Sequence, residues 1–232
     1  MTEIGRAFEA QRPDVRVDVQ AGGSSRGIAD IRSGVADMGM VSRALNDDEK
    51  DLKAYPVARD GICVILNKKN PVNILSDQQV ADIYRGKITR WKDVGGRDAA
   101  ITVVSKAEGR STLELFLRYY RLKNTDIKAS VIIGDNEQGI KTIVGNPNAI
   151  AYVSIGSAEF DGENGNPVKR LPMNGVAASI ATVKNEKFPL SRSLNLVTKT
   201  LPQGLVKAFI DFSQSNAVAD LIEDLYFVPI TQ

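Results

Sequence analysis

The chain of 232 residues is 43% hydrophobic and 25% charged, an ordinary globular composition with enough apolar residues for a sizeable core. Its 30 basic and 28 acidic residues leave a net charge of +2, which is too balanced to predict a nucleic-acid partner or a membrane-surface stripe. A single cysteine, Cys63, and the absence of histidine exclude disulfides within the chain, histidine-based metal sites and histidine-dependent triads.

The first quarter of the chain alternates predicted helices and strands. Apolar spacing predicts a helix over 2–11, and VRVDVQ at 15–20 has the period-two pattern of a half-buried strand. Two glycines and two serines at 22–25 precede an apolar repeat, which predicts a loop that opens onto a helix. We also expect a short buried strand, a short helix and a longer strand, at 36–42, 47–55 and 61–68.

The rest of the chain keeps this rhythm. A helix is predicted between Ser76, a capping residue with Gln79 at the capping-box position, and Gly86 after the last turn. Further strands are predicted at 101–106, 129–133, 149–155 and 194–199, and further helices at 111–121, 136–145, 203–213 and 215–224. Strands interleaved with helices predict an α/β architecture with mostly parallel sheets.

Hydroxyl groups and glycines gather where predicted strands lead into helices, in GGSSRG, VSRALNDDE and SKAEGRST. A helix N-terminus presents unpaired backbone N–H groups and the positive end of the helix dipole, so such junctions suit anions. In the third junction the cations Lys106 and Arg110 stand beside Ser111 and Thr112. The alternative is structural, because Ser and Thr cap helices whatever the function and surface cations are ordinarily solvated.

The run RDGICVILNKKNPVNILSDQQVADIYRGKITRWKDVGG, at 59–96, resembles a signature stretch of the phosphate-binding proteins of phosphate ABC transporters. An Asp-Gly strand, an Asn-Pro turn, a Gly-Lys-Ile-x-x-Trp segment and a Gly-Gly turn follow in the family's order. Further similarity lies at 21–45, 146–160, 188–199 and 206–230. Together these segments cover nearly the whole chain, and their order is what makes the resemblance specific.

The resemblance implies a two-lobe periplasmic-binding-protein fold of type II, each lobe a mostly parallel sheet flanked by helices. The first lobe would comprise 1–59 and 193–232 and the second 60–192, with crossings near Ala58–Gly61 and Leu190–Asn195. Phosphate or a related tetrahedral oxyanion would bind in the cleft between the lobes. A membrane permease would then recognise the closed, ligand-bound form. Such a protein works in the periplasm or outside the cell, with a lipid anchor as an alternative.

Two family positions in the first lobe are kept and one departs. Ser24, followed by Ser25, matches a serine donor at the start of a helix, and Ser42 matches the serine after the buried strand. The family commonly follows that second serine with an aspartate that accepts the proton of monohydrogen phosphate. Here the position is Arg43, so a proton acceptor has become a donor. The resemblance therefore predicts that Arg43→Asp sharpens the preference for phosphate over sulfate.

The second-lobe loop departs from the family frame as well. Family members commonly carry an arginine clamp followed, after two residues, by Gly-Ser-Gly-Thr, whereas this chain reads Lys106, Ala107, Glu108, Gly109 and then Arg110, Ser111, Thr112. Lysine cannot form the bidentate fork of arginine, which Arg110 would supply four residues later. Glu108 is a candidate proton acceptor or, equally, a solvated carboxylate.

The resemblance implies that the chain starts within the family's first helix, so we expect it to lack the first strand of the first lobe and one phosphate loop. Residues 1–20 also lack the apolar core of a signal peptide, and no apolar run approaches the ~20 residues of a membrane span. A strand missing from a sheet uncovers backbone donors and acceptors on its neighbour. We therefore expect a homodimer or a domain swap through the first lobe.

Three classes of function remain open at this point. The first is a phosphate-binding component of an ABC transporter, without cofactor, metal or enzymatic activity. The second, an enzyme acting on phosphate esters, lacks support because the chain has no histidine, no P-loop and no clear carboxylate cluster for metal ions. The third is a sensing protein of the same fold, or one whose phosphate site has been altered or lost, which the departures at Arg43 and Lys106 keep in consideration.

Overall fold

The computed structural model describes residues 1–231 and divides the chain into two compact units. Unit 1 comprises Met1–Arg59 and Arg192–Gln232, and unit 2 comprises Asp60–Ser191. Strands β2 (Lys53–Asn67) and β7 (Ser191–Thr198) carry the chain past the two points of division. Within the described residues, no helix has both the length and the apolar character needed to cross a membrane.

Unit 1 contains a small antiparallel sheet with helices on both faces. Strand β1 (Gly39–Val41) pairs with β7, and β8 (Val228–Pro229) pairs with β2, both antiparallel. Neighbouring positions of β7 point to opposite faces, so Leu196 and Val197 enter two different clusters. The helical elements of this unit are α1 (Thr2–Gln11), α2 (Ser24–Ser33), η1 (Asp47–Glu49), α8 (Gly204–Ser213), η4 (Asn216–Val218) and α9 (Ala219–Asp224).

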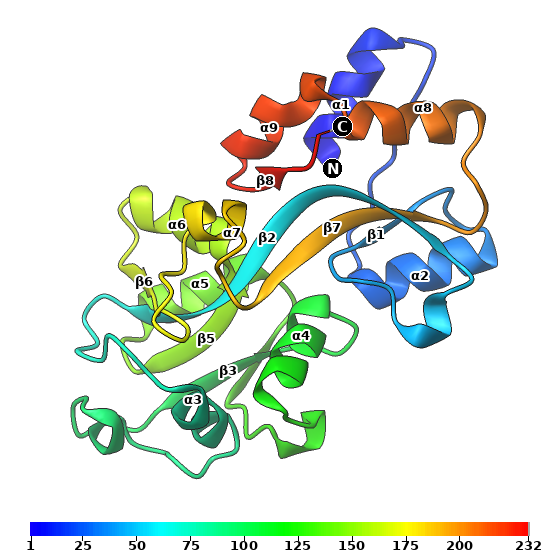
Figure 1. Ribbon diagram of the computed structural model, residues 1–232. Helices are drawn as coiled ribbons and strands as arrows, with labels where there is room; N and C mark the ends of the chain where they lie inside the picture. The colour runs from blue at the N-terminus through cyan, green and yellow to red at the C-terminus, as the bar shows by residue number, and fades with distance from the viewer. Residues whose placement is uncertain (232) are drawn as a thin grey trace. The chain divides into compact units, whose positions relative to one another are not determined.

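Helices α1, α8 and α9 cover one face of the unit 1 sheet, and α2 covers the other (Figure 1). Phe8 of α1 meets Phe209 of α8 edge-on at 5.2 Å between ring centroids. On the other face Ile28 and Ile31 of α2 pack with Val197. This second cluster also contains Val41 of β1, so it holds α2 beside β1.

Unit 2 is built on a mixed sheet. Strands β3 (Thr102–Lys106), β4 (Val131–Ile133) and β5 (Ala149–Ser154) run parallel, while β2 and β6 (Val168–Arg170) are antiparallel to their neighbours. The strand order is β2-β5-β3-β4, with β6 on β2. The helical elements are α3 (Asp77–Tyr84), η2 (Trp91–Val94), α4 (Ser111–Tyr120), η3 (Asn124–Asp126), α5 (Asn136–Gly145), α6 (Ile155–Glu163) and α7 (Ile180–Lys184).

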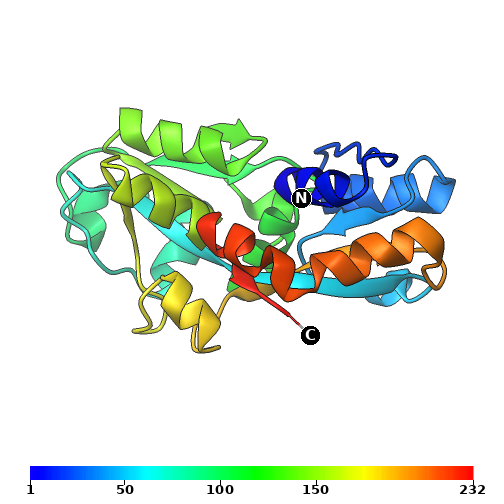
Figure 2. The same ribbon diagram turned by 90° about the horizontal axis from the view of Figure 1, so that it is seen from above.

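An aromatic cluster packs α3 and α4 against one face of the unit 2 sheet. Tyr152 of β5 stacks on Phe116 of α4 with centroids 3.8 Å apart, and Tyr84 of α3 meets it edge-on. On the opposite face, Gly139 lets α5 approach the side chain of Val153. Figures 1 and 2 show α5 and α6 together on that side of the sheet. The central strand β5 is thus buried at every position, whereas β4 at the edge leaves Ile132 exposed.

Most of the predicted elements are confirmed, and three expectations are wrong: the strand at 15–20, the mostly parallel sheets and the helix at 47–55. Residues 15–20 are extended and bury Val15, but they pair with no strand among residues 1–231. The sheets are mixed rather than mostly parallel, because β2 runs antiparallel to each strand it pairs with in the described pairings. The short helix expected at 47–55 is the three-residue η1, and residues from Lys53 onward already belong to β2. Elements α6, β6, α7 and β8 were not predicted.

The predicted capping box of α3 is present. Ser76 Oγ accepts from the Gln79 backbone N–H at 3.2 Å, and Gln79 Oε1 accepts from the Ser76 N–H at 2.9 Å. We expect Ser76→Ala to lower the free energy of unfolding by about 1 kcal/mol, because the Gln79 N–H at the head of α3 loses its acceptor. Urea denaturation measures the change, and Ser76→Asp, which keeps an acceptor, is the control. An alanine variant as stable as the parent would contradict this prediction.

Candidate functional site

In unit 1, the N-terminus of α2 lies against the loop that follows β1. Ser24, the first residue of α2, is buried, and its Oγ accepts a hydrogen bond from the Ser42 backbone N–H at 3.0 Å. Helix α2 begins after Gly23, whose φ of 88° favours glycine, and no side chain caps it. The structure therefore brings Ser24 and Ser42 together, as the sequence predicted. Ser25, one residue further on, is exposed.

Arg43 is engaged in a buried ion pair. Its two terminal nitrogens bind the carboxylate of Glu49, with Nη1–Oε2 at 2.6 Å and Nη2–Oε1 at 2.9 Å. Arg43 is 2% exposed and Glu49 6% exposed. The hydrogen bonds from Arg43 hold the pKa of Glu49 below its usual value. Arg43 was expected among the phosphate-binding residues as a donor, but both terminal nitrogens of its guanidinium bind Glu49.

Further contacts fix the loop that carries Ser42 and Arg43. Glu49 Oε2 accepts from the Asn46 backbone N–H at 2.8 Å, in a capping box that opens η1. Asn195 of β7 donates its side-chain amide to the carbonyl of Arg43 at 2.8 Å and to that of Val41 at 3.1 Å. Glu49 and Asn195 are the residues that the sequence did not single out. The spacing Asn46-x-x-Glu49, a capping-box pattern, was a signal for the first of them.

In unit 2, three parallel strands end at the same edge of the sheet, and a helix begins after each. Strand β3 leads to α4, β4 to α5 and β5 to α6. Lys106 of β3 and Ile133 of β4 lie side by side in register. Ligands of α/β proteins bind at this carboxyl edge, where helix N-termini present their N–H groups. The junction SKAEGRST is one of the three.

Lys106 reaches from β3 to the head of α5. Its Nζ donates to the backbone carbonyl of Asp135 at 2.6 Å and to Asn136 Oδ1 at 2.9 Å. Its backbone N–H donates to the hydroxyl of Tyr152 at 3.2 Å, and the residue is 3% exposed. Lys106 therefore fastens two neighbouring junctions to each other.

Arg110 differs from Lys106 in its surroundings. It stands at the N-cap position of α4, where no side chain caps the helix, and it is half-buried. A methyl group placed on Gly134 would lie 3.7 Å from Arg110 Nη2, so the guanidinium lies near the approach to α5. Within residues 1–231, the side chain of Arg110 has neither a hydrogen-bond partner nor an ion-pair partner.

The remaining predicted residues of this loop divide into two groups. Ser111 and Thr112 are buried in the first turn of α4, directly after Arg110. Glu108 is exposed, and its Oε1 accepts from the side-chain amide of Asn124 at 2.6 Å. The loop thus places Ser111 and Thr112 directly after Arg110, while the carboxylate of Glu108 binds Asn124 of η3.

Helix α5 begins at Asn136, as predicted, and the residue before it caps the helix. Asp135 Oδ1 accepts from the Gln138 N–H at 2.8 Å. Asn136 binds Lys106 and also donates to Ser157 Oγ of α6 at 3.4 Å. Asn136 is therefore a link among the three junctions of this edge.

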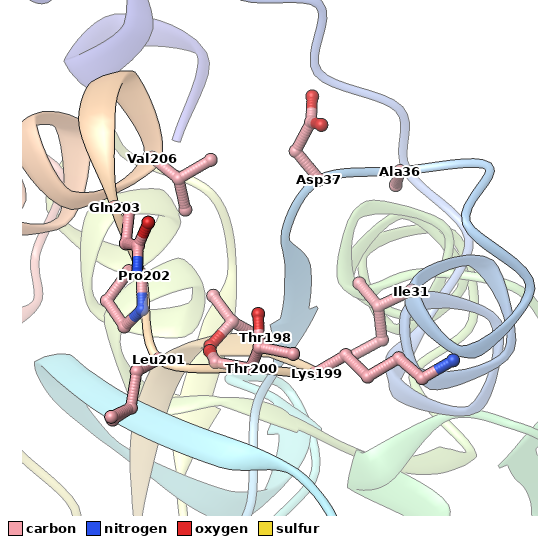
Figure 3. Close-up of a pocket in the computed structure, with 10 residues that line it drawn as sticks. All are labelled: Ile31, Ala36, Asp37, Thr198, Lys199, Thr200, Leu201, Pro202, Gln203 and Val206. Carbon is pink, nitrogen blue, oxygen red and sulfur yellow. The ribbon is translucent and has the colours of Figure 1, made fainter.

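A separate hollow of about 530 Å³ opens in unit 1 between the end of β7, the start of α8 and the C-terminal part of α2 (Figure 3). Thr198, Thr200 and Gln203 contribute polar groups to it, and Ile31 and Val206 contribute apolar ones. None of the predicted site residues lines this hollow. Among the described residues, no group of three or more cysteine and acidic side chains is arranged to hold a metal ion.

The two units each supply one set of donors suited to an anion. Unit 1 offers the head of α2 with Ser24 and Ser42, and unit 2 offers the head of α4 with Arg110. Neither α2 nor α4 has a side-chain cap, a property that they share with α1, α6, α8 and α9. Uncapped helix N-termini can donate their N–H groups to a bound oxyanion.

Comparisons with known proteins agree with this chemistry. A family model, the PBP superfamily domain, matches residues 1–217. The phosphate-binding protein PstS of Bacillus subtilis is 28% identical over 230 residues, which cover 97% of this chain and 74% of that protein.

Two solved structures are similar over almost the whole chain. A phosphate ABC transporter substrate-binding protein with bound phosphate from Clostridium perfringens is 32% identical, with a TM-score of 0.88, and the match covers 99% of this chain and 94% of that one. An ABC-type phosphate transport receptor from Vibrio cholerae is 28% identical, with a TM-score of 0.82, covering 98% and 94% of the two chains.

Proposed function

Because the chain belongs to the PBP superfamily and, within it, to the phosphate-binding proteins of phosphate ABC transporters, we propose that it binds inorganic phosphate for delivery to a transporter permease. The family binds its ligand without chemical change, so the enzyme alternative is set aside. No cofactor enters the proposal. The Clostridium perfringens relative holds phosphate, and this chain matches it over 99% of its length.

The observation that carries the proposal is the carboxyl edge of unit 2. Three parallel strands end there, α4 begins without a side-chain cap, and the half-buried guanidinium of Arg110 stands at its head without a partner among residues 1–231. A cation and N–H donors at one helix terminus suit a dehydrated oxyanion. Ser111 and Thr112 in the first turn would add hydroxyl donors to the same anion.

The first unit would supply the other half of the site. Ser24, Ser25 and Ser42 at the head of α2 are the proposed donors there, and Arg43 would act by holding the loop of Ser42. In this proposal units 1 and 2 are the two lobes of the family's fold, and β2 and β7 are the crossings. Lobe closure over the anion would then be the signal for the permease.

Isothermal titration calorimetry tests the function. We expect phosphate to bind with a Kd of about 1 μM or tighter, which corresponds to about −8 kcal/mol. Sulfate, arsenate and molybdate are titrated in parallel, to establish which oxyanion is preferred. No heat with any of the four anions would contradict the proposal and favour a sensing protein, or a relative with an altered site. That alternative rests on Arg43 and Lys106, which depart from the family frame.

The place of action follows the family. We propose that the protein works outside the cytoplasmic membrane, in the periplasm or at the cell surface, where transporter binding proteins meet their permeases. A lipid anchor remains an alternative to a diffusing protein. The expected homodimer through unit 1 gains no support from the comparisons, and the proposed function does not depend on it.

A further inference from the structure

We propose that Arg110, and not Lys106, is the cation that binds the anion in this protein. Lys106 has a structural role, because it joins the end of β3 to the start of α5 through hydrogen bonds. The inference rests on the proposed function, because it assigns roles within the same phosphate site. It concerns two cations four residues apart in one loop, and both lie in unit 2.

Lys106 already has protein partners. An ammonium group has three donors, and two of them go to the Asp135 carbonyl at 2.6 Å and to Asn136 Oδ1 at 2.9 Å. The side chain is 3% exposed, and turning it toward an anion would break both of these hydrogen bonds. Lys106 therefore joins the end of β3 to the head of α5, and this fixes the spacing of two anion-facing junctions.

Arg110 has the opposite properties. Its five N–H donors have no protein partner among residues 1–231, although the residue is half-buried. Its backbone is the N-cap of α4, so the guanidinium stands at the positive end of that helix. A cation does not gain stability from the helix dipole at this end, which makes the placement costly unless an anion lies beside it.

The same side chain lies near a second helix N-terminus. Arg110 Nη2 is 3.7 Å from the position that a methyl group on Gly134 would occupy, and Gly134 leads directly into the cap of α5. A planar guanidinium between two helix heads can grip two oxygens of one tetrahedral anion. The fork that Lys106 cannot form is thus available from Arg110.

Phosphate titrations of two variants test the assignment. We expect Arg110→Ala to weaken phosphate binding by about 100-fold or more, because two charge-assisted hydrogen bonds are lost. Its unfolding midpoint without phosphate should stay the same or rise, since the side chain has no partner in the described protein and the variant no longer holds a cation at the positive end of α4. Arg110→Lys should recover only part of the affinity, because an ammonium lacks the fork.

The comparison variant is Lys106→Met, which keeps the length of the side chain and removes its charge. We expect it to lower the unfolding midpoint in the absence of phosphate and to weaken binding less than Arg110→Ala does. Arg97→Ala removes an exposed cation elsewhere in unit 2 and should leave the phosphate Kd unchanged, which controls for net charge. A larger loss of affinity from Lys106→Met than from Arg110→Ala would overturn the assignment. If the parent protein binds no phosphate, the proposed function itself fails. If the parent binds phosphate and the Arg110→Ala variant binds it equally well, only the assignment of Arg110 as the anion-binding cation is refuted.

Discussion

Replacing Glu49 by alanine is expected to lower the free energy of unfolding by about 3–5 kcal/mol, because it leaves the guanidinium of Arg43 buried without its carboxylate. Arg43 is 2% exposed, so the solvent cannot replace the two lost hydrogen bonds. The capping contact from the Asn46 N–H is lost as well. Urea denaturation gives the total change, and hydrogen exchange should show it on the amides of unit 1 first.

The double variant Arg43→Met with Glu49→Leu is the matched control. Replacing both charges with apolar side chains removes the cost of burying them, so we expect this variant to be much more stable than Glu49→Ala alone. If the single and the double variants were equally destabilised, the packing of the two side chains, and not the pairing of their charges, would account for the stability of this loop. Sequence reasoning expected Arg43→Asp to sharpen the preference for phosphate over sulfate. The structure leads instead to a loss of stability, since an aspartate there would face Glu49 across a buried contact.

Acid should weaken the same pair. The pKa of Glu49 in the folded protein lies below its usual value, and the hydrogen bonds from Arg43 are the main cause. The unfolded chain therefore binds the proton more readily than the folded one. The stabilisation is fully present above about pH 4.3, the usual pKa of glutamate, and is lost as the pH falls through the lower folded value.

The start of α4 could be predicted from the junction SKAEGRST, but the different surroundings of its two cations could not. Its hydroxyls and glycine predicted a helix start with anion-binding chemistry, and α4 begins there, at Ser111. Sequence could not separate Lys106 from Arg110, because both are cations in one loop. Their surroundings differ because β3 pairs with β4, the strand that leads into α5, and this brings the Asp135 carbonyl and Asn136 into hydrogen-bond contact with Lys106.

Two further differences have the same origin in tertiary pairing. VRVDVQ alternates as predicted and buries Val15, but alternation reports which side chains face the core and not whether the backbone has a strand partner. Interleaved helices and strands suggested parallel sheets, yet β2 runs antiparallel to β5. The order of helices and strands along the chain does not determine whether a strand such as β2 runs parallel or antiparallel to the strands it pairs with.

The second large effect is expected from Tyr152→Ala, which should lower the free energy of unfolding by about 3–5 kcal/mol. Tyr152 is 1% exposed, stacks on Phe116 and meets Tyr84 edge-on, so its removal leaves a cavity between β5 and the helices α3 and α4. Its hydroxyl also lies 2.9 Å from Ser105 Oγ and accepts from the Lys106 N–H. Urea denaturation measures the loss, and hydrogen exchange should assign it to unit 2.

Tyr152→Phe separates the ring from the hydroxyl. It keeps the aromatic packing but takes a buried partner from Ser105 and from the Lys106 N–H, so a loss of about 1–3 kcal/mol is expected. Burial raises the pKa of Tyr152 to about 12, above the usual value of about 10 for tyrosine, and the folded protein holds this proton more tightly than the unfolded chain. The resulting stabilisation is present below about pH 10 and disappears as the pH rises toward 12, so the Phe variant should lose less stability than the parent over that interval. If both proteins lost the same stability at alkaline pH, other buried groups would account for the alkaline sensitivity of unit 2. Tyr84 is one such group, because burial raises its pKa as well.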